Sequence, residues 1–193
     1  MLNDVEGKVI AEIGGSNSRV LPLLRERNEC WNIDKLDGDS GGATYRSSLG
    51  KGIKLVRAFL GDNSPELPSN YFDYVLSISV MEHVPGAALE RYFSDMARIM
   101  KFGAKAFHAI DFYVSDEIDP ELTSLLLSLH RASKSAGLEF IEEPALLDKI
   151  IMKSDYATHS DMGLMSWNIS APGLRTKRES HQVVSVKCGW VKP

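Results

Sequence analysis

The stretch KVIAEIGGSN near the amino terminus constrains the fold of this chain more than any other feature. An apolar run carries the acid Glu12 near its end and then breaks at the paired glycines Gly14 and Gly15. Such runs are typical of buried parallel strands, and glycines let the following backbone turn sharply and approach a ligand closely. The stretch therefore predicts a strand whose glycine turn forms the floor of a site for an anionic or polar cofactor. A tight joint between strand and helix is the alternative reading of the same glycines.

Length and composition predict one globular domain over residues 1–193. The chain is 44% hydrophobic and 25% charged, which is ordinary for a protein with a single large core. No apolar run reaches the about 18 residues that a membrane span needs. The amino terminus also lacks the basic region and apolar core of a signal peptide. We therefore expect a cytoplasmic protein that does not associate with membranes.

Charge and cysteine content argue against nucleic-acid binding and against a zinc site. The net charge is −4, and the locally basic run LRTKRESH at 174–181 is interpreted as a solvated loop, with contact to an anionic substrate as the alternative. Cys30 and Cys188 lie near opposite ends of the chain, without CxxC spacing or a Cys/His cluster. We expect two buried thiols.

Strand-like and helical segments alternate along the chain. This alternation predicts an α/β fold, Rossmann-like and doubly wound, with a mostly parallel seven-stranded sheet and helices on both faces. Helices are expected over residues 18–27, 88–100 and 120–136. In the second of these, Leu89, Phe93, Met96 and Met100 recur at helical spacing and indicate core packing. The expected strands cover residues 8–14, 29–34, 53–62, 71–80, 104–111, 138–143 and 182–191.

Residues 144–182 fit this alternation least well. They join the last two strands and far exceed the usual length of a connection. Long connections in compact domains are often functional, so this insertion is a candidate substrate lid or the surface of a homo-oligomer, with extra packing as the alternative. Its aromatic, histidine and methionine residues are Tyr156, His159, Met162, Met165 and Trp167.

Several motifs, in this order, resemble the class I S-adenosylmethionine-dependent methyltransferases over about residues 7–143. AEIGGSN is similar to the family's acid-x-Gly-x-Gly loop, with Ser16 in place of the second loop glycine. ECWNID ends in Asp34, about 20 residues past the glycines, and FLGD ends in Asp62. FDYVLSISVMEHVP resembles the fourth strand and following turn of the small-molecule members, and ARIMKFGAKAFHAID resembles their next helix, turn and strand.

The resemblance implies that the cofactor is S-adenosyl-L-methionine, held at the carboxyl ends of the parallel strands. It assigns Glu12 and the glycine turn to the methionine part, Asp34 to the ribose hydroxyls and Asp62 to the adenine amino group. The turn after the fourth strand is assigned to the sulfonium side. The implied cofactor-binding residues are Glu12, Gly14, Gly15, Ser16, Asn17, Asp34, Lys35, Asp62, Ser79 and Val80.

His83 and Asp111 are the candidate catalytic residues. His83 lies in the family's Glu-His-Val turn and is the leading base, although a structural role of that turn is the alternative. Asp111 ends the fifth strand, where family members place substrate-facing residues. Because strand positions alternate between faces, His108 and Asp111 should face opposite sides of the sheet, and we prefer Asp111. Glu82 and His83 should diverge, so we expect no metal site.

The predicted function is S-adenosylmethionine-dependent methylation, with an oxygen of a small-molecule or sugar-like acceptor as the expected target. No Asn-Pro-Pro-Tyr stretch follows the fourth strand and no broad basic face is evident, which disfavours nucleic acid as the substrate. One alternative is a catalytically silent member of the fold that acts as a cofactor-binding or assembly subunit. Another, a nicotinamide dehydrogenase, is disfavoured because the glycines do not complete G-x-G-x-x-G. Few residues precede the first strand, so we expect residues 144–182, a second subunit or a large substrate to cover the site.

Overall fold

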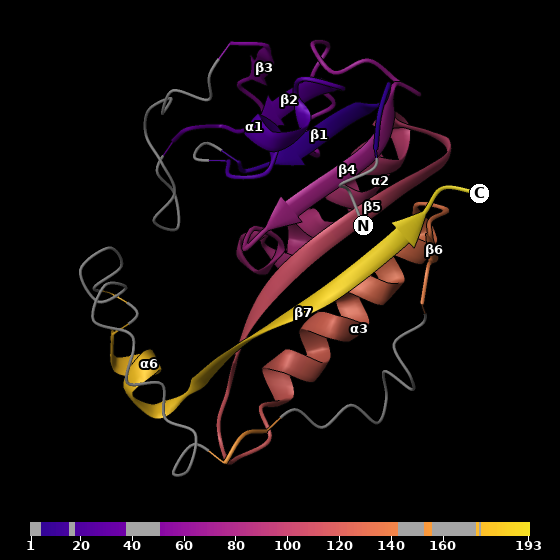
Figure 1. The fold of residues 1–193 in the computed structure, drawn as a ribbon. Coiled ribbons are helices and arrows are strands. Elements are labelled where there is room, and N and C mark those ends of the chain that lie inside the picture. Colours follow the sequence, from indigo (N-terminus) through magenta and orange to yellow (C-terminus); the bar gives the residue numbers. More distant parts are fainter. Residues whose placement is uncertain (1–4, 16–17, 38–50, 143–152, 156–172, 174) are drawn as a thin grey trace.

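One sheet of seven strands runs through the residues that the computed structural model describes, namely 5–15, 18–37, 51–142, 153–155, 173 and 175–193 (Figure 1). The strand order is β3-β2-β1-β4-β5-β7-β6. Strands β1 to β5 pair in parallel, whereas β7 runs antiparallel between β5 and β6. The predicted seven-stranded, mostly parallel, Rossmann-like sheet is confirmed. Its strands are β1 (Val9–Ile13), β2 (Glu29–Ile33), β3 (Ile53–Val56), β4 (Phe72–Ile78), β5 (Met100–Val114), β6 (Glu139–Phe140) and β7 (Gln182–Val191).

Helices lie on both faces of this sheet, but they cover them unequally. The short helix α1 (Leu21–Leu24) packs on one face, in a small cluster with Ile10, Cys30, Ile53 and Leu76. The longer helices α2 (Leu89–Ile99) and α3 (Pro120–Ser135) lie together on the other face and enclose the larger core. Two 3-10 turns, η2 (Met81–His83) and η3 (Gly86–Ala88), connect β4 to α2, and α6 (Arg175–Ser180) leads into β7.

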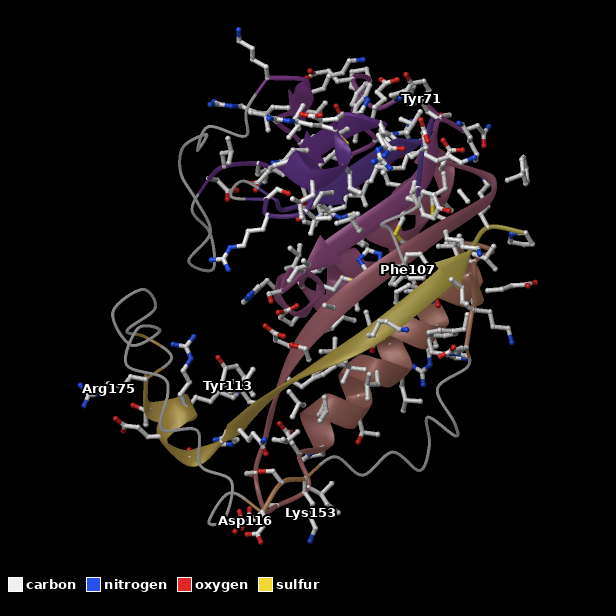
Figure 2. All side chains as sticks on the ribbon, viewed as in Figure 1. Tyr71, Phe107, Tyr113, Asp116, Lys153 and Arg175 are labelled. Atoms are coloured by element: carbon white, nitrogen blue, oxygen red, sulfur yellow. The ribbon has the colours of Figure 1, made fainter. Side chains whose placement is uncertain are left out.

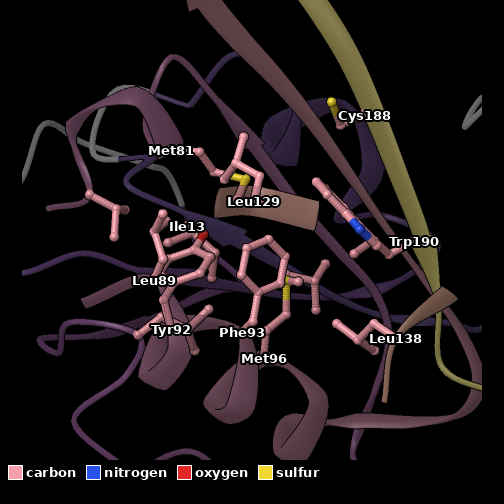
Figure 3. Packing of buried hydrophobic residues seen from close by; sticks show 14 of the residues in the cluster. Ile13, Met81, Leu89, Tyr92, Phe93, Met96, Leu129, Leu138, Cys188 and Trp190 are labelled. Carbon is pink, nitrogen blue, oxygen red and sulfur yellow. The ribbon is translucent and has the colours of Figure 1, made fainter. Parts of the chain in front are cut away.

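The larger core explains why α2 forms where the sequence predicted it. Leu89, Phe93, Met96 and Met100 are all buried, so the stripe is core as expected. Figure 3 shows this face of α2 directed toward Trp190 of β7, and the ring centroids of Phe93 and Trp190 lie 5.2 Å apart. The helix is therefore held by side chains from the antiparallel strand as well as from the parallel ones.

Several elements differ in length from the prediction. Helix α1 has four residues rather than ten. The chain before Leu21 forms a turn in which the Ser18 hydroxyl accepts hydrogen bonds from the backbone N–H groups of Val20 and Leu21, and the polar residues 25–27 add no apolar face that could be buried. Strand β3 ends at Val56, because its neighbour β2 ends at Ile33. Strand β5 instead extends to Val114, since ten of its residues pair with β7.

The basic run at 174–181 is not the solvated loop that the sequence indicated. Most of it forms α6, in which Arg178 is buried. The Lys177 ammonium lies 5.0 Å from the ring centroid of Tyr113 in β5, and Figure 2 shows Tyr113 on the side of the sheet near α6. An ion pair between Arg175 and Glu179, 2.8 Å apart, links successive turns. The run is therefore a short helix with most residues exposed, one of which contacts Tyr113 of β5.

The candidate lid at residues 144–182 lies mostly outside the described residues, which include only 153–155, 173 and 175–182 of this segment. Tyr156, His159, Met162, Met165 and Trp167 are all outside them. The role of the segment as a lid or an oligomer surface stays a prediction. Separately, none of the helices among the described residues is long and apolar enough to cross a membrane.

Candidate functional site

The glycine turn after β1 lies directly against two side chains of the site. A Cβ added to Gly14, whose φ is 68°, would lie 2.6 Å from Cγ2 of Val80. A Cβ added to Gly15 would lie 2.6 Å from the carboxyl carbon of Glu12. Both glycines are thus favoured by close packing within the protein, as in the tight joint that was the alternative reading, and their role as the floor of a cofactor site stays a prediction. Ser16 and Asn17, the rest of the predicted turn, lie outside the described residues.

Glu12 is a buried carboxyl group beneath this turn. It is 4% exposed, and burial raises its pKa to about 7, while a hydrogen bond donated by the Ser18 hydroxyl opposes the shift. The Ser18 hydroxyl oxygen also accepts a hydrogen bond from the Leu21 backbone N–H at 2.9 Å. Ser18 therefore joins the acid of β1 to the first turn of α1.

Asn32 supports the turn from the neighbouring strand and was missed by the sequence analysis. It is fully buried in β2, and its side-chain amide donates a hydrogen bond of 2.5 Å to the Gly15 carbonyl. Within the described part of the chain, its Oδ1 has no hydrogen-bond partner. An amide inside the apolar strand ECWNI is the signal that could have revealed it, because buried polar side chains need a partner.

Asp34 and Lys35 follow β2 at the same edge of the sheet. The half-buried carboxylate of Asp34 accepts a hydrogen bond of 2.8 Å from the Leu36 backbone N–H. Lys35 is exposed and pairs with Asp37 at 2.9 Å. The structure therefore places Asp34 at the strand end that the ribose assignment requires, whereas it directs Lys35 into a surface ion pair.

Asp62 lies on an exposed turn after β3, between two residues with positive φ. These neighbours are Gly61, at 119°, and Asn63, at 50°. The backbone N–H groups of both donate to one carboxylate oxygen of Asp95 in α2, at 2.7 and 3.2 Å. Asp95, which the sequence analysis missed, thus fixes the turn that carries Asp62.

The turn after β4 brings Ser79 to Asp111. Ser79 has a φ of 54°, in the left-handed region that is uncommon for residues with a side chain. Its hydroxyl donates a hydrogen bond of 2.6 Å to one oxygen of the Asp111 carboxylate. The hydroxyl of Ser185 in β7 donates to the other oxygen. Since Val80 lies against Gly14, Asp111 and the glycine turn border the same short segment.

Glu82 and His83 diverge, as the sequence predicted for a helical turn. His83 is exposed, whereas Glu82 is largely buried. Burial raises the pKa of Glu82 to about 7, and the negative charge of Asp111 acts in the same direction, whereas hydrogen bonds from the backbone N–H groups of Glu82 and Asp111 oppose the shift. Across the described residues, no group of three or more His, Cys, Asp or Glu side chains is placed to hold a metal ion. Cys30 and Cys188 are buried free thiols.

His108 lies on the opposite face of β5 from Asp111, in the larger core. Its Nδ1 is 2.6 Å from the Ser77 hydroxyl, and its ring centroid is 5.5 Å from that of Trp190. Complete burial lowers the pKa of His108 to about 3, so the imidazole is neutral. The alternation argument that separated His108 from Asp111 is therefore correct, and His108 belongs to the core.

A family model described as a methyltransferase domain matches residues 11–107, about half of the chain. No curated protein matches the sequence. Among solved structures, phosphoethanolamine N-methyltransferase 2 of Haemonchus contortus, in complex with phosphomonomethylethanolamine and S-adenosylhomocysteine, is similar with a TM-score of 0.58 at 14% identity. The match covers 97% of this chain and 49% of that protein, so this chain spans about half the length of the Haemonchus enzyme.

Two further structures show how widely this fold is used. Geranyl diphosphate C-methyltransferase of Streptomyces coelicolor, in complex with Mg²⁺, geranyl diphosphate and S-adenosylhomocysteine, has a TM-score of 0.59 at 12% identity, covering 98% of this chain and 75% of that one. The 4+2 cyclase SpnF also has a TM-score of 0.59, at 13% identity, covering 97% and 76%. At these identities the likeness shows the fold alone.

Proposed function

We propose a function for this chain from its family, since it belongs to the class I S-adenosylmethionine-dependent methyltransferases. It methylates an oxygen of a small, hydroxyl-bearing acceptor, for example a sugar-like one. The observation that supports a binding site for the acceptor hydroxyl is the position of the Asp111 carboxylate, which accepts hydrogen bonds from Ser79 and Ser185 beside the turn after β4. As parts of the same proposal, the acceptor is not a nucleic acid and the protein acts in the cytoplasm. The net charge of −4 supports the first of these.

The residues at the strand ends fit S-adenosylmethionine by their chemistry. Besides a carboxylate, the cofactor carries an ammonium, a sulfonium, two ribose hydroxyls and an adenine amino group, and each of these latter groups is cationic or donates hydrogen bonds. Three acids follow one another across the sheet: Glu12 in β1, Asp34 after β2 and Asp62 on the turn after β3. Carboxylates accept hydrogen bonds and stabilise positive charge, so this set complements the cofactor from the methionine part to the adenine.

When bound, S-adenosylmethionine supplies an activated methyl group, so the protein has to orient the acceptor and take up its proton. Asp111 is suited to the acceptor oxygen, because the two serine hydroxyls fix its carboxylate in one orientation. Each carboxylate oxygen can accept more than one hydrogen bond, which leaves capacity for an acceptor hydroxyl. We assign Asp111 to binding that hydroxyl and accepting its proton.

His83 is the second candidate for the base. Its exposed side chain lies on the 3-10 turn two residues before Pro85, close in sequence to Ser79 and Val80. A neutral imidazole there can take a proton from an acceptor held over the turn. The catalytic and the structural role of His83 differ in their consequence. If His83 is the base, its replacement lowers turnover, whereas if it is structural, its replacement lowers stability.

The test begins with calorimetric titration of S-adenosylhomocysteine, for which we expect micromolar binding. Turnover of labelled methyl groups is then measured against a panel of sugars and other small alcohols. We expect Asp111→Asn to lower turnover roughly 10²–10⁴-fold while the affinity for S-adenosylhomocysteine stays within about twofold. Asp116→Asn, an exposed carboxylate beyond the end of β5, serves as the control that changes neither (Figure 2).

His83→Ala is measured in the same assay, together with its unfolding free energy. A comparable loss of turnover at unchanged stability would make His83 the base and reduce Asp111 to a binding role. Full turnover of Asp111→Asn would remove Asp111 from the site. Binding of S-adenosylhomocysteine with no transfer to any acceptor would instead favour the catalytically silent reading of the fold.

A further inference from the structure

We propose that Asp95 of α2 is a positioning residue that sets the orientation of Asp62 at the adenine end of the cofactor site. The proposal rests on the proposed function in one respect, namely that Asp62 binds the cofactor. The turn concerned, residues 60–63, joins the end of β3 to the long connection toward β4. Asp95 itself is a fully buried residue of α2.

The carboxylate of Asp95 is fully buried, and hydrogen bonds account for both of its oxygens. Oδ2 accepts the backbone N–H groups of Gly61, at 2.7 Å, and Asn63, at 3.2 Å. Oδ1 accepts a hydrogen bond of 2.7 Å from Nε of Arg98 in the same helix. A charged acceptor that is buried and paired in this way holds its donors more firmly than a neutral one would.

The two donors to Oδ2 flank Asp62, so the backbone is held on both sides of this residue. The remaining N–H group in this run, that of Asp62 itself, donates to the Phe59 carbonyl at 3.2 Å. Three consecutive backbone N–H groups are therefore fixed, while the Asp62 side chain is exposed. The carboxylate of Asp95 thus determines where Asp62 is presented.

The backbone of the turn adopts a conformation that needs such support. Gly61 and Asn63 both have positive φ values, 119° and 50°. A Cβ added to Gly61 would lie 3.2 Å from the backbone nitrogen of Tyr92, so the turn lies close against α2. Glycine adopts such a φ without strain, whereas Asn63 lies in the left-handed region, and its backbone N–H is held there by the hydrogen bond to Asp95.

Arg98 also holds the later part of the connection between β3 and β4. Its Nη1 donates to the Leu67 carbonyl at 2.7 Å and to the Ser69 hydroxyl at 3.1 Å. Asp95 and Arg98, which form an ion pair within α2, therefore hold the β3–β4 connection at two places, residues 61–63 and residues 67–69. This leaves the side chains of Asp62 and Asn63, which are both exposed, as the parts of the turn available to a ligand, and of the two Asp62 carries the charge.

The experiment is a double-mutant cycle read by calorimetric titration with S-adenosylhomocysteine. Asp62→Ala and Asp95→Asn should each weaken binding roughly tenfold, which is about the value of one hydrogen bond to a charged group. The double variant should bind no worse than Asp62→Ala alone, because Asp95 acts only through Asp62. Should Asp95→Asn fail to fold, Arg98→Lys, which loses the fork of donors, takes its place in the cycle.

Asp73→Asn is the matched control. Asp73 also accepts a backbone N–H group, that of Val9 at 2.8 Å, and also pairs with a cation, Lys101 at 2.8 Å. It lies at the start of β4, at the opposite edge of the sheet from the site. We expect this variant to lose stability but to bind S-adenosylhomocysteine as the wild type does.

Two outcomes overturn the positioning role. One is unchanged affinity in Asp95→Asn, and the other is a loss that multiplies with that of Asp62→Ala, which would show that Asp95 acts on the fold as a whole. Wild-type protein that does not bind S-adenosylhomocysteine overturns the proposed function instead. In that case hydrogen exchange at the amides of residues 61–63 tests whether Asp95 fixes the backbone of the turn. Faster exchange in Asp95→Asn than in the wild type supports this role, and unchanged exchange refutes it.

Discussion

Replacing Glu12 by Gln should stabilise the ligand-free protein at high pH. Glu12 is buried beneath the glycine turn, and its pKa is raised from 4.5 to about 7 because burial disfavours the ionised form. Glutamine keeps the size of the side chain and can still accept the hydrogen bond from Ser18. The substitution therefore removes the buried charge with little change in packing against Gly15.

The sign and size follow from proton linkage. Between pH 4.5 and 7 the folded wild type holds a proton on Glu12 that the unfolded chain has already released, so its stability falls as the pH rises. The full difference corresponds to about 3 kcal/mol and is reached above the folded pKa. Glu12→Gln, which has no proton to lose, should match the wild type near pH 4 and exceed it by up to this amount at pH 8.

Urea unfolding at a series of pH values between 4 and 8.5 measures this difference. Glu26→Gln is the control, because it removes an exposed carboxylate after α1 and should leave the pH profile unchanged. Parallel profiles for wild type and Glu12→Gln would refute the assignment of a buried, reluctantly ionised carboxyl. Glu12→Gln should also bind S-adenosylmethionine more weakly than the wild type, since it lacks the carboxylate that complements the positive charge of the cofactor.

Two further variants test residues of the predicted cofactor site, one by its affinity for the ligand and the other by its stability. Asp34→Ala should weaken S-adenosylhomocysteine binding by about 1.5–3 kcal/mol, the range for hydrogen bonds to a charged group, and unchanged affinity in a calorimetric titration would take Asp34 out of the site. Gly14→Ala should lower the unfolding free energy by about 2–3 kcal/mol, from a φ of 68° and a Cβ 2.6 Å from Val80. Gly7→Ala, with a φ of 67° and no atom within 4 Å of the added Cβ, isolates the backbone part; equal losses in denaturant unfolding would contradict the packing argument.

Local sequence determined the strands, the main helices and the glycine turn. Apolar runs and helical spacing depend on residues that are near one another in the chain, so β1, β4 and α2 could be located from their letters alone. The acids Glu12, Asp34 and Asp62 came from the resemblance of their short motifs to the family; Glu12 lies in β1 and Asp34 directly after β2, whereas Asp62 lies on a turn beyond the end of β3. Where a neighbouring strand sets the length, as for β3 and β5, the prediction failed.

Tertiary structure alone decided which side chains hold the site together. Ser185 reaches Asp111 across 74 residues, because β7 is inserted antiparallel beside β5 in one particular register. Asp95 reaches Gly61 across 34 residues, because α2 packs on the larger core beneath the turn after β3. Such contacts depend on strand order, register and helix packing, and no local pattern encodes them. The sequence by itself predicted which groups bind the cofactor, and only the folded chain decided which side chains orient those groups.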